Sequence, residues 1–215
     1  MKTYYPACKF TGNFPETSKK IQAYMTQKHN ARIAGCCRPS LPSLTQNDMA
    51  IYICHACAAF FAESSAARNI TSIWEIIASD DTFVYPDHTG KSMTLQDCWR
   101  ARGDVSQQNA VRKILNKMNI EIIELAQNRE NSNFCGKFLY EELPEFCVKL
   151  APNHFINNAE GLFIPHSEEE KDVLMRDHCK AIQTGSVVCY CGSCLRGLTA
   201  GGKTGIHLAE LVFGS

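Results

Sequence analysis

The chain has 215 residues, of which 45% are hydrophobic and 20% charged, as in an ordinary globular protein. Its 22 lysines and arginines balance its 22 aspartates and glutamates, so no basic excess favours a nucleic-acid partner. The first residues lack the apolar core of a signal peptide, and the most apolar segment, 50–62, is too short to cross a bilayer. We therefore expect a cytoplasmic protein that has no membrane span and binds no nucleic acid.

The chain contains 12 cysteines, which is many for a protein of the cytoplasm. Thiols are kept reduced in that compartment, and structural disulfides are rare there. Metal binding and redox catalysis are therefore the roles to expect for cysteines that recur at regular places in the sequence.

The first half of the chain predicts three strands, each followed closely by cysteine. The strands are expected at 2–5, 31–34 and 50–53, with helices over 15–28 and after residue 57. The cysteines that follow these strands are, in order, Cys8, the adjacent pair Cys36 and Cys37, and the Cys-x-x-Cys pair Cys54 and Cys57.

The second half repeats this order after a linker, 69–91, which holds a short predicted helix around 74–77. Its strands are expected at 93–96, 120–125 and 186–190, and its helices over 105–118, 137–150, 168–184 and after residue 191. The cysteines that follow its strands are Cys98, Cys135, Cys191 and Cys194. We therefore divide the chain into a first cysteine-rich repeat, 1–68, the linker, and a second cysteine-rich repeat, 92–215.

Strands that alternate with helices are typical of parallel sheets, so we predict an α/β fold with two related parallel-sheet units in tandem. In such sheets, sites gather where loops leave the carboxyl ends of the strands. Every cysteine of the repeated set follows a strand. The metal sites are therefore expected at the carboxyl ends of the strands in both repeats.

The two repeats offer different numbers of sulfur ligands, five in the first and four in the second. Four thiolates suit zinc and an iron–sulfur cluster about equally. Five do not suit tetrahedral zinc, so the first repeat favours a larger iron cluster. A Cys-x-x-Cys step at a helix start also favours thiolates, because backbone N–H groups and the helix dipole point toward it.

The ordered set of motifs resembles the cysteine-rich CCG-domain family, which contains the cysteine-rich subunit of heterodisulfide reductase. The motifs that carry the resemblance are 4–8, 36–37 and 53–57 in the first half, and 97–98, 134–136 and 188–194 in the second; the tail, 206–211, resembles a short closing helix. The chain departs from the family in three places. Arg38 stands where the family has glycine, Phe134 stands where it has cysteine, and the segment between Cys37 and Cys54 is shorter.

The resemblance implies which cysteines hold a cofactor. In the first repeat, a noncubane [4Fe-4S] cluster that cleaves a disulfide would be held by Cys8, Cys36, Cys37, Cys54 and Cys57. In the second, Cys98, Cys135, Cys191 and Cys194 would hold a conventional [4Fe-4S] cluster or zinc, or would have a structural role. We take Cys36, Cys37 and His55 as the catalytic candidates, although His55 could also point outward from the start of its helix.

We therefore predict a heterodisulfide-reductase-like oxidoreductase, an iron–sulfur subunit that acts on a small thiol or disulfide through one or two [4Fe-4S] clusters. The chain lacks the cysteine run of ferredoxins and a dinucleotide-binding fingerprint, which implies electrons from a partner iron–sulfur protein or flavoprotein subunit. The alternative is a non-catalytic zinc- or cluster-binding subunit that has a structural or interaction role in a redox complex.

Several other residues near these motifs have two interpretations. Cys147 and Cys179 lie in helical segments without a partner motif and are expected to be core or semi-exposed thiols. Cys189 alternates with Val187 along a strand, so we expect it in the core rather than as a ligand. His88, Arg100 and Arg102 flank the second cysteine set and could bind an anion or be surface groups.

Residues 197–204 match the Walker A pattern of nucleotide-binding loops letter by letter. A true P-loop joins a strand to a long helix inside a unit that continues afterwards. Here a helix is expected to begin before Gly197, and only eleven residues follow Thr204, too few in our interpretation for another strand. We therefore predict a glycine-rich loop that ends a helix, without a nucleotide.

Overall fold

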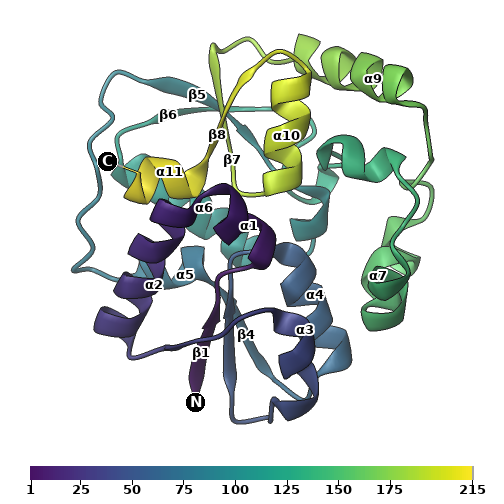
Figure 1. The fold of residues 1–215 in the computed structure, drawn as a ribbon. Helices are drawn as coiled ribbons and strands as arrows, with labels where there is room; N and C mark the ends of the chain where they lie inside the picture. Colours follow the sequence, from purple (N-terminus) through teal and green to yellow (C-terminus); the bar gives the residue numbers. More distant parts are fainter. Residues whose placement is uncertain (215) are drawn as a thin grey trace. The chain divides into compact units, whose positions relative to one another are not determined.

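The computed structural model describes residues 1–214 and contains two four-stranded, all-parallel sheets flanked by helices (Figure 1). The strand order is β2-β1-β3-β4 in the first sheet and β6-β5-β7-β8 in the second. Each strand of one sheet therefore has a counterpart at the same place in the other. The predicted α/β fold with two related parallel-sheet units is confirmed.

The first sheet is built around β1 and β3, whose side chains are almost all buried. Its strands are β1 (Lys2–Tyr5), β2 (Arg32–Ile33), β3 (Met49–Tyr52) and β4 (Asn69–Ser72). The accompanying helices are α1 (Cys8–Asn13), α2 (Pro15–His29), α3 (Cys37–Ser40) and α4 (His55–Ser64), with the 3-10 turn η1 (Leu41–Ser43). Because β1 pairs in parallel with both β2 and β3, the loops at the carboxyl ends of these three strands lie at the same edge of the sheet.

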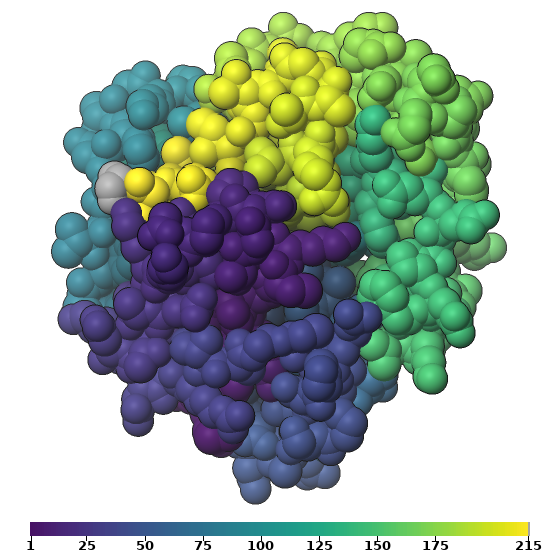
Figure 2. Space-filling view, in the orientation of Figure 1, coloured from purple at the N-terminus to yellow at the C-terminus, as the bar shows by residue number. Residues whose placement is uncertain are grey.

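The second sheet repeats this plan around β5 and β7, which are also almost wholly buried. Its strands are β5 (Ser92–Gln96), β6 (Glu121–Glu124), β7 (Ser186–Cys189) and β8 (Thr204–His207). The helices are α6 (Val105–Lys117), α9 (Glu168–Lys180), α10 (Gly192–Ala200) and α11 (Leu208–Phe213), with the 3-10 turns η2 (Trp99–Ala101), η3 (Arg129–Asn131) and η4 (Gly136–Tyr140). On the face shown in Figure 2, α9 and α10 pack side by side.

The chain forms two compact units whose limits do not follow sequence order alone. The first contains residues 1–76, 143–160 and 214, and the second contains 77–142 and 161–213. The boundary at 76/77 falls within α5 (Ile73–Ser79), and the returning segment contains α7 (Glu145–Leu150), α8 (Pro152–Phe155) and η5 (Asn157–Ala159). The limits 1–68, 69–91 and 92–215 follow from the repeated order of elements in the sequence and stay a prediction.

The segment 143–160 is fastened to α4 by hydrogen bonds to two adjacent side chains. The Glu63 carboxylate accepts the backbone N–H groups of Asn153 at 2.7 Å and His154 at 2.8 Å. The Ser64 hydroxyl donates to the carbonyl oxygen of Leu150 at 2.6 Å. Because Glu63 binds the first turn of α8, it supplies the acceptor that a helix start needs.

The edge strands β4 and β8 lie where the sequence analysis expects no strand. The sequence predicts a linker with one helix over 69–91, yet this segment also contains β4. The expectation that no strand could follow Thr204 is wrong, because four residues suffice for β8 to pair with β7, from Ser186↔Thr204 to Cys189↔His207. The Walker A match still fails, since its glycines lie in and after α10 and lead from a helix into a strand, the reverse of a P-loop.

Candidate metal centre

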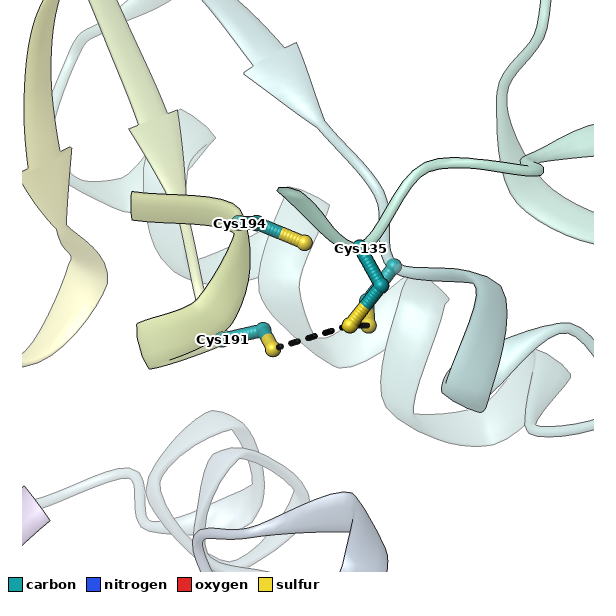
Figure 3. Close-up of side chains that lie close together, drawn as sticks. Cys135, Cys191 and Cys194 are labelled. Atoms are coloured by element: carbon teal, nitrogen blue, oxygen red, sulfur yellow. Dashed lines mark hydrogen bonds between the residues drawn. The ribbon is translucent and has the colours of Figure 1, made fainter. Parts of the chain in front are cut away.

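Four cysteines of the second unit converge at the carboxyl ends of its strands. Cys98 follows β5, Cys135 lies in the connection after β6, and Cys191 and Cys194 follow β7. Figure 3 shows the side chains of Cys135, Cys191 and Cys194 pointing toward one another. This is the place at which the sequence predicts a metal site.

The four sulfur atoms lie close enough together to bind one metal. Cys98 Sγ is 3.7 Å from Cys135 Sγ, and Cys135 Sγ is 4.0 Å from Cys191 Sγ. All four sulfurs lie within 4.8 Å of one another. Three of the cysteines are fully buried and Cys191 is 7% exposed, so solvent barely reaches the group. We call these four residues the cysteine tetrad.

Three members of the tetrad stand at helix starts. Cys98, Cys135 and Cys191 are the residues that cap the amino-terminal ends of η2, η4 and α10. Backbone N–H groups at such ends lack partners within the helix and point toward the capping residue. Negative charge on the sulfurs is therefore favoured where the loops converge.

The thiols of the tetrad share their protons unequally. Hydrogen bonds from Cys135, Cys194 and Cys98 lower the pKa of Cys191 well below its usual value. Burial, together with hydrogen bonds to Cys135 and Cys191, raises the pKa values of Cys98 and Cys194 well above theirs. Metal ligands must be deprotonated, so a bound cation would displace the protons of these thiols.

A buried ion pair stands directly behind the tetrad. The Asp97 carboxylate accepts from Arg112 Nη2 at 2.6 Å, from the Tyr190 hydroxyl at 2.6 Å and from the Arg129 backbone N–H at 2.8 Å. Burial raises the pKa of Asp97, but the hydrogen bonds from Arg112 and Tyr190 outweigh burial, so the pKa is lowered overall. Arg112 also binds Glu124 of β6 at 2.6 Å.

This network positions the tetrad because its members precede ligands in the chain. Asp97 is followed by Cys98, and Tyr190 is followed by Cys191. The bond between their side chains therefore ties the ends of β5 and β7 together. The sequence motif at 97–98 does not by itself reveal the roles of Arg112 and Tyr190.

Two glycines allow the loop after Cys135 to lie directly against α10. Gly136 has φ +59°, and a Cβ there would collide with the carbonyl oxygen of Ser193. A Cβ at Gly197 would collide with the Cα of Gly136. Because neither residue has a side chain, Cys135 comes within reach of Cys191 and Cys194.

Phe134, which immediately precedes Cys135, packs against a histidine of α9. Its ring stacks on that of His178, with centroids 3.8 Å apart and planes at 9°. His178 Nε2 lies 2.6 Å from Gln96 Oε1, and burial lowers the pKa of His178 to about 4. Phe134 is thus part of a stacked pair with a neutral imidazole beside the tetrad.

The five cysteines predicted as ligands in the first unit are much more accessible. Cys8 is exposed, Cys36 and Cys54 are half-buried, and Cys37 and Cys57 are buried. The thiol of Cys57 is hydrogen-bonded to those of Cys37 and Cys54; the first bond lowers the pKa of Cys37 and raises that of Cys57. Within residues 1–214 only the tetrad brings three or more ligand atoms within 4.8 Å of one another. The five-sulfur set stays a prediction.

His55 does not point outward from its helix. It is 3% exposed, and its ring lies 6.1 Å from that of Tyr52, edge to face. Burial at the start of α4, between Cys54 and Cys57, corrects the alternative of a surface histidine. Its catalytic role stays a prediction.

The remaining candidates lie outside the tetrad. Cys147, Cys179 and Cys189 are buried, as expected of core residues. Arg100 stacks on Phe138 with its Cζ 4.1 Å from the ring centroid, and the Arg102 side chain donates to the Ser132 carbonyl oxygen. His88 Nε2 lies 3.4 Å from the carbonyl oxygen of Leu211.

Comparison of the chain with protein-family models, curated proteins and solved structures found no match. Among residues 1–214, no helix combines the length and the apolar character that crossing a membrane requires.

Proposed function

We propose that this protein is a subunit of a thiol–disulfide oxidoreductase in which the first unit performs the redox chemistry and the second holds a structural zinc ion. The observation that carries the proposal is the contrast in exposure between the two cysteine sets. The tetrad is buried, whereas Cys8, Cys36 and Cys54 are reached by solvent. Structural zinc sites are closed, and catalytic sites must admit a substrate.

Zinc is the metal that best fits the spacing of the tetrad. Four thiolates around one tetrahedral ion at about 2.3 Å stand about 3.8 Å from one another. The sulfur pairs at 3.7 and 4.0 Å match this separation. An iron–sulfur cluster would place several irons and bridging sulfides between the same cysteines and would hold them farther apart. We therefore assign a single ion to the tetrad.

The first unit offers the groups that thiol chemistry needs. Cys36 and Cys37 are adjacent, Cys36 is partly exposed, and the hydrogen bond from Cys57 lowers the pKa of Cys37. A sulfur with a lowered pKa is the better nucleophile and metal ligand near neutral pH. Five sulfurs also exceed the needs of tetrahedral zinc, which favours a [4Fe-4S] cluster of the kind found in the CCG-domain family. Such a cluster would supply electrons one at a time and bind substrate sulfur.

A second candidate function is a non-catalytic subunit of a redox complex. It is favoured by the finding that the only group of cysteines converging within 4.8 Å in residues 1–214 is the closed one. In that case the first-unit cysteines would bind no cluster, and the protein would serve to hold other subunits.

Metal analysis of paired variants tests the proposal. The wild-type protein and the variants Cys194→Ser and Cys37→Ser are purified anaerobically. Each is then assayed for zinc, iron and acid-labile sulfide. We expect about one zinc, lost only in Cys194→Ser, and iron with sulfide, lost only in Cys37→Ser. Disulfide reduction with reduced viologen as electron donor should disappear in Cys37→Ser. Wild-type protein with zinc but no iron and no activity would support the non-catalytic subunit instead.

A further inference from the structure

Arg38 lies among the cysteines of the first unit, directly after Cys36 and Cys37 in the chain. Cys36 is the N-cap of α3, and Arg38 is the second residue of this helix. Interaction with Cys36, and the charges of Cys37 and Cys8, raise the pKa of the Arg38 guanidinium. The guanidinium is exposed to solvent. Arg38 therefore places a positive charge directly after the paired cysteines.

An aromatic ring from the segment 143–160 holds the guanidinium in place. Arg38 Cζ lies 4.7 Å from the centroid of the Phe146 ring, the arrangement of a cation–π pair. Phe146 is 42% exposed, and its ring packs edge to face against Phe60 of α4 with centroids 6.1 Å apart. Phe60 is buried and is itself packed on Phe155. The ring under Arg38 is therefore anchored in the core of the same unit.

The contact between Phe146 and Phe60 connects Arg38 to α4, the helix that carries Cys57. Glu63 and Ser64, one turn beyond Phe60 on α4, fasten the segment 143–160 through backbone hydrogen bonds. Arginine in such a setting loses little of its freedom when it binds a ligand, since the stacked guanidinium is already oriented. Within residues 1–214 no carboxylate forms a salt bridge with Arg38.

We propose that Arg38 binds the anionic group of the substrate, so that the first-unit site takes thiols and disulfides that carry a carboxylate, sulfonate or phosphate. The planar guanidinium presents paired N–H donors that match such oxyanions. Its place beside Cys36 puts the substrate sulfur near the reactive thiols. Arg38 is thus a specificity-determining residue, and this assignment rests on the function proposed above.

The reaction that this site would serve is the reduction of a disulfide. The S–S bond breaks, two electrons and two protons are taken up, and two thiols leave. The electrons come from a protein partner, or from reduced viologen in the assay. Arg38 takes no part in the electron transfer, since its charge is constant at every pH of interest.

Competitive alkylation tests the anion site without any redox assay. Full-length chain from iron-depleted medium, kept reduced, is treated with equal amounts of iodoacetate and iodoacetamide, and adducts at Cys8, Cys36 and Cys37 are counted by mass spectrometry. Iodoacetate is anionic and iodoacetamide is neutral, but both alkylate the same thiolate. The ratio of their adducts at one cysteine therefore reports the preference for an anion and is independent of the reactivity of the thiol. Arg38→Gln should lower the iodoacetate share at these residues about three- to tenfold, and Arg38→Lys should largely keep it.

The matched control is Arg68→Gln. Arg68 is exposed and immediately precedes β4, so it lies at the amino-terminal edge of the same sheet, away from the cysteine loops. The control should leave the ratio unchanged. An unchanged ratio in Arg38→Gln, or an equal fall in Arg68→Gln, would overturn the proposal.

The activity assay separates this inference from the function on which it rests. With reduced viologen, Arg38→Gln should lower kcat/KM for dithiodipropionate about tenfold and leave the neutral hydroxyethyl disulfide unaffected. An equal loss for both disulfides would refute the role of Arg38 in specificity while disulfide reduction stands. A wild-type protein that reduces neither disulfide, although the alkylation ratio falls in Arg38→Gln, would refute the proposed function and with it the assignment of the anion site to a thiol substrate.

Discussion

The two units share one plan but use it for cysteines of opposite exposure. Both have four parallel strands in the same order, and both place cysteine after the first three of them. In the second unit the glycines at 136 and 197 let the loops close until the sulfurs are buried. In the first unit Arg38 and an exposed Phe146 stand beside half-open cysteines. The difference teaches that sequence spacing places the cysteines, whereas the surrounding side chains decide whether they form a closed or an open site.

Removing one cysteine sulfur of the tetrad should cause the largest loss of folding stability. Removing a cysteine sulfur of the first unit should not cause such a loss. Cys194→Ser leaves a metal ion with three thiolates in a buried site, and a structural zinc ion at four thiolates is worth on the order of 10 kcal/mol of folding free energy. We expect Cys194→Ser to lower the free energy of unfolding by several kcal/mol and to release zinc. Cys54→Ser, compared in protein from iron-depleted medium so that no cluster contributes to stability, is the matched control in the first unit. Equal losses of stability in the two variants, measured by thermal unfolding, would break the comparison.

The buried ion pair behind the tetrad should give the next largest effect. Asp97→Asn leaves Arg112 buried with a weaker partner, and breaking such a pair costs about 3–5 kcal/mol. Because the folded-state pKa of Asp97 is lowered, its contribution is fully present above the unfolded value of about 3.9 and is lost as pH falls through the folded value. Denaturant unfolding at pH 7 and at acid pH measures both effects.

The control for this substitution is Asp177→Asn, which breaks an exposed pair with Lys180 in the same unit. Exposed pairs contribute less than about 1 kcal/mol. A loss in Asp97→Asn no larger than that in Asp177→Asn would show that the network does not support the tetrad.

A comparison of two glycines separates the cost of a steric collision from the cost of backbone strain. The collision would occur where the loop after Cys135 lies against α10. Gly136 and Gly90 both have positive φ, +59° and +84°, but only at Gly136 would a Cβ meet other atoms. We expect Gly90→Ala to cost about 1 kcal/mol from strain, and Gly136→Ala to cost about 2 kcal/mol more because the loop must move. The second substitution should also weaken zinc binding in a chelator competition. Equal costs for the two substitutions would mean that close approach is unimportant.

The smallest loss of stability is expected from weakening the attachment of the segment 143–160 to α4. Glu63→Gln weakens the charge-assisted hydrogen bonds to Asn153 and His154 and should cost about 1 kcal/mol. Glu16→Gln, which affects an exposed pair with Lys19, is the control and should cost less than half of that. Hydrogen exchange should show faster opening of α8 in Glu63→Gln alone. Unchanged exchange there would mean that Glu63 does not fasten the segment.

Much of this arrangement could be predicted from local patterns. The apolar strands β1, β3, β5 and β7 and the amphipathic helix α6 stand where hydrophobic periodicity places them. The tetrad can be found in the sequence because each of its cysteines belongs to a motif that follows a strand. Parallel topology then brings those motifs to one edge of the sheet.

The features that the sequence does not reveal depend on contacts between distant residues. β4 and β8 are four-residue strands with a single apolar side chain each, so neither has a pattern that separates it from a loop. Arg112 lies on a helix where a charge normally indicates solvent, and only the fold brings Asp97 and Glu124 to it. The return of 143–160 to the first unit likewise depends on Glu63 and Phe60, which lie far earlier in the chain.

X-ray absorption at the zinc edge tests most directly whether the tetrad is a closed, single-ion centre. We expect four sulfur neighbours at about 2.3 Å and no nearby metal. We expect this signal to survive in Cys37→Ser and to be lost in Cys194→Ser. A tetrad that contains iron with a second metal at short range, or zinc bound by fewer than four sulfurs, would contradict this assignment.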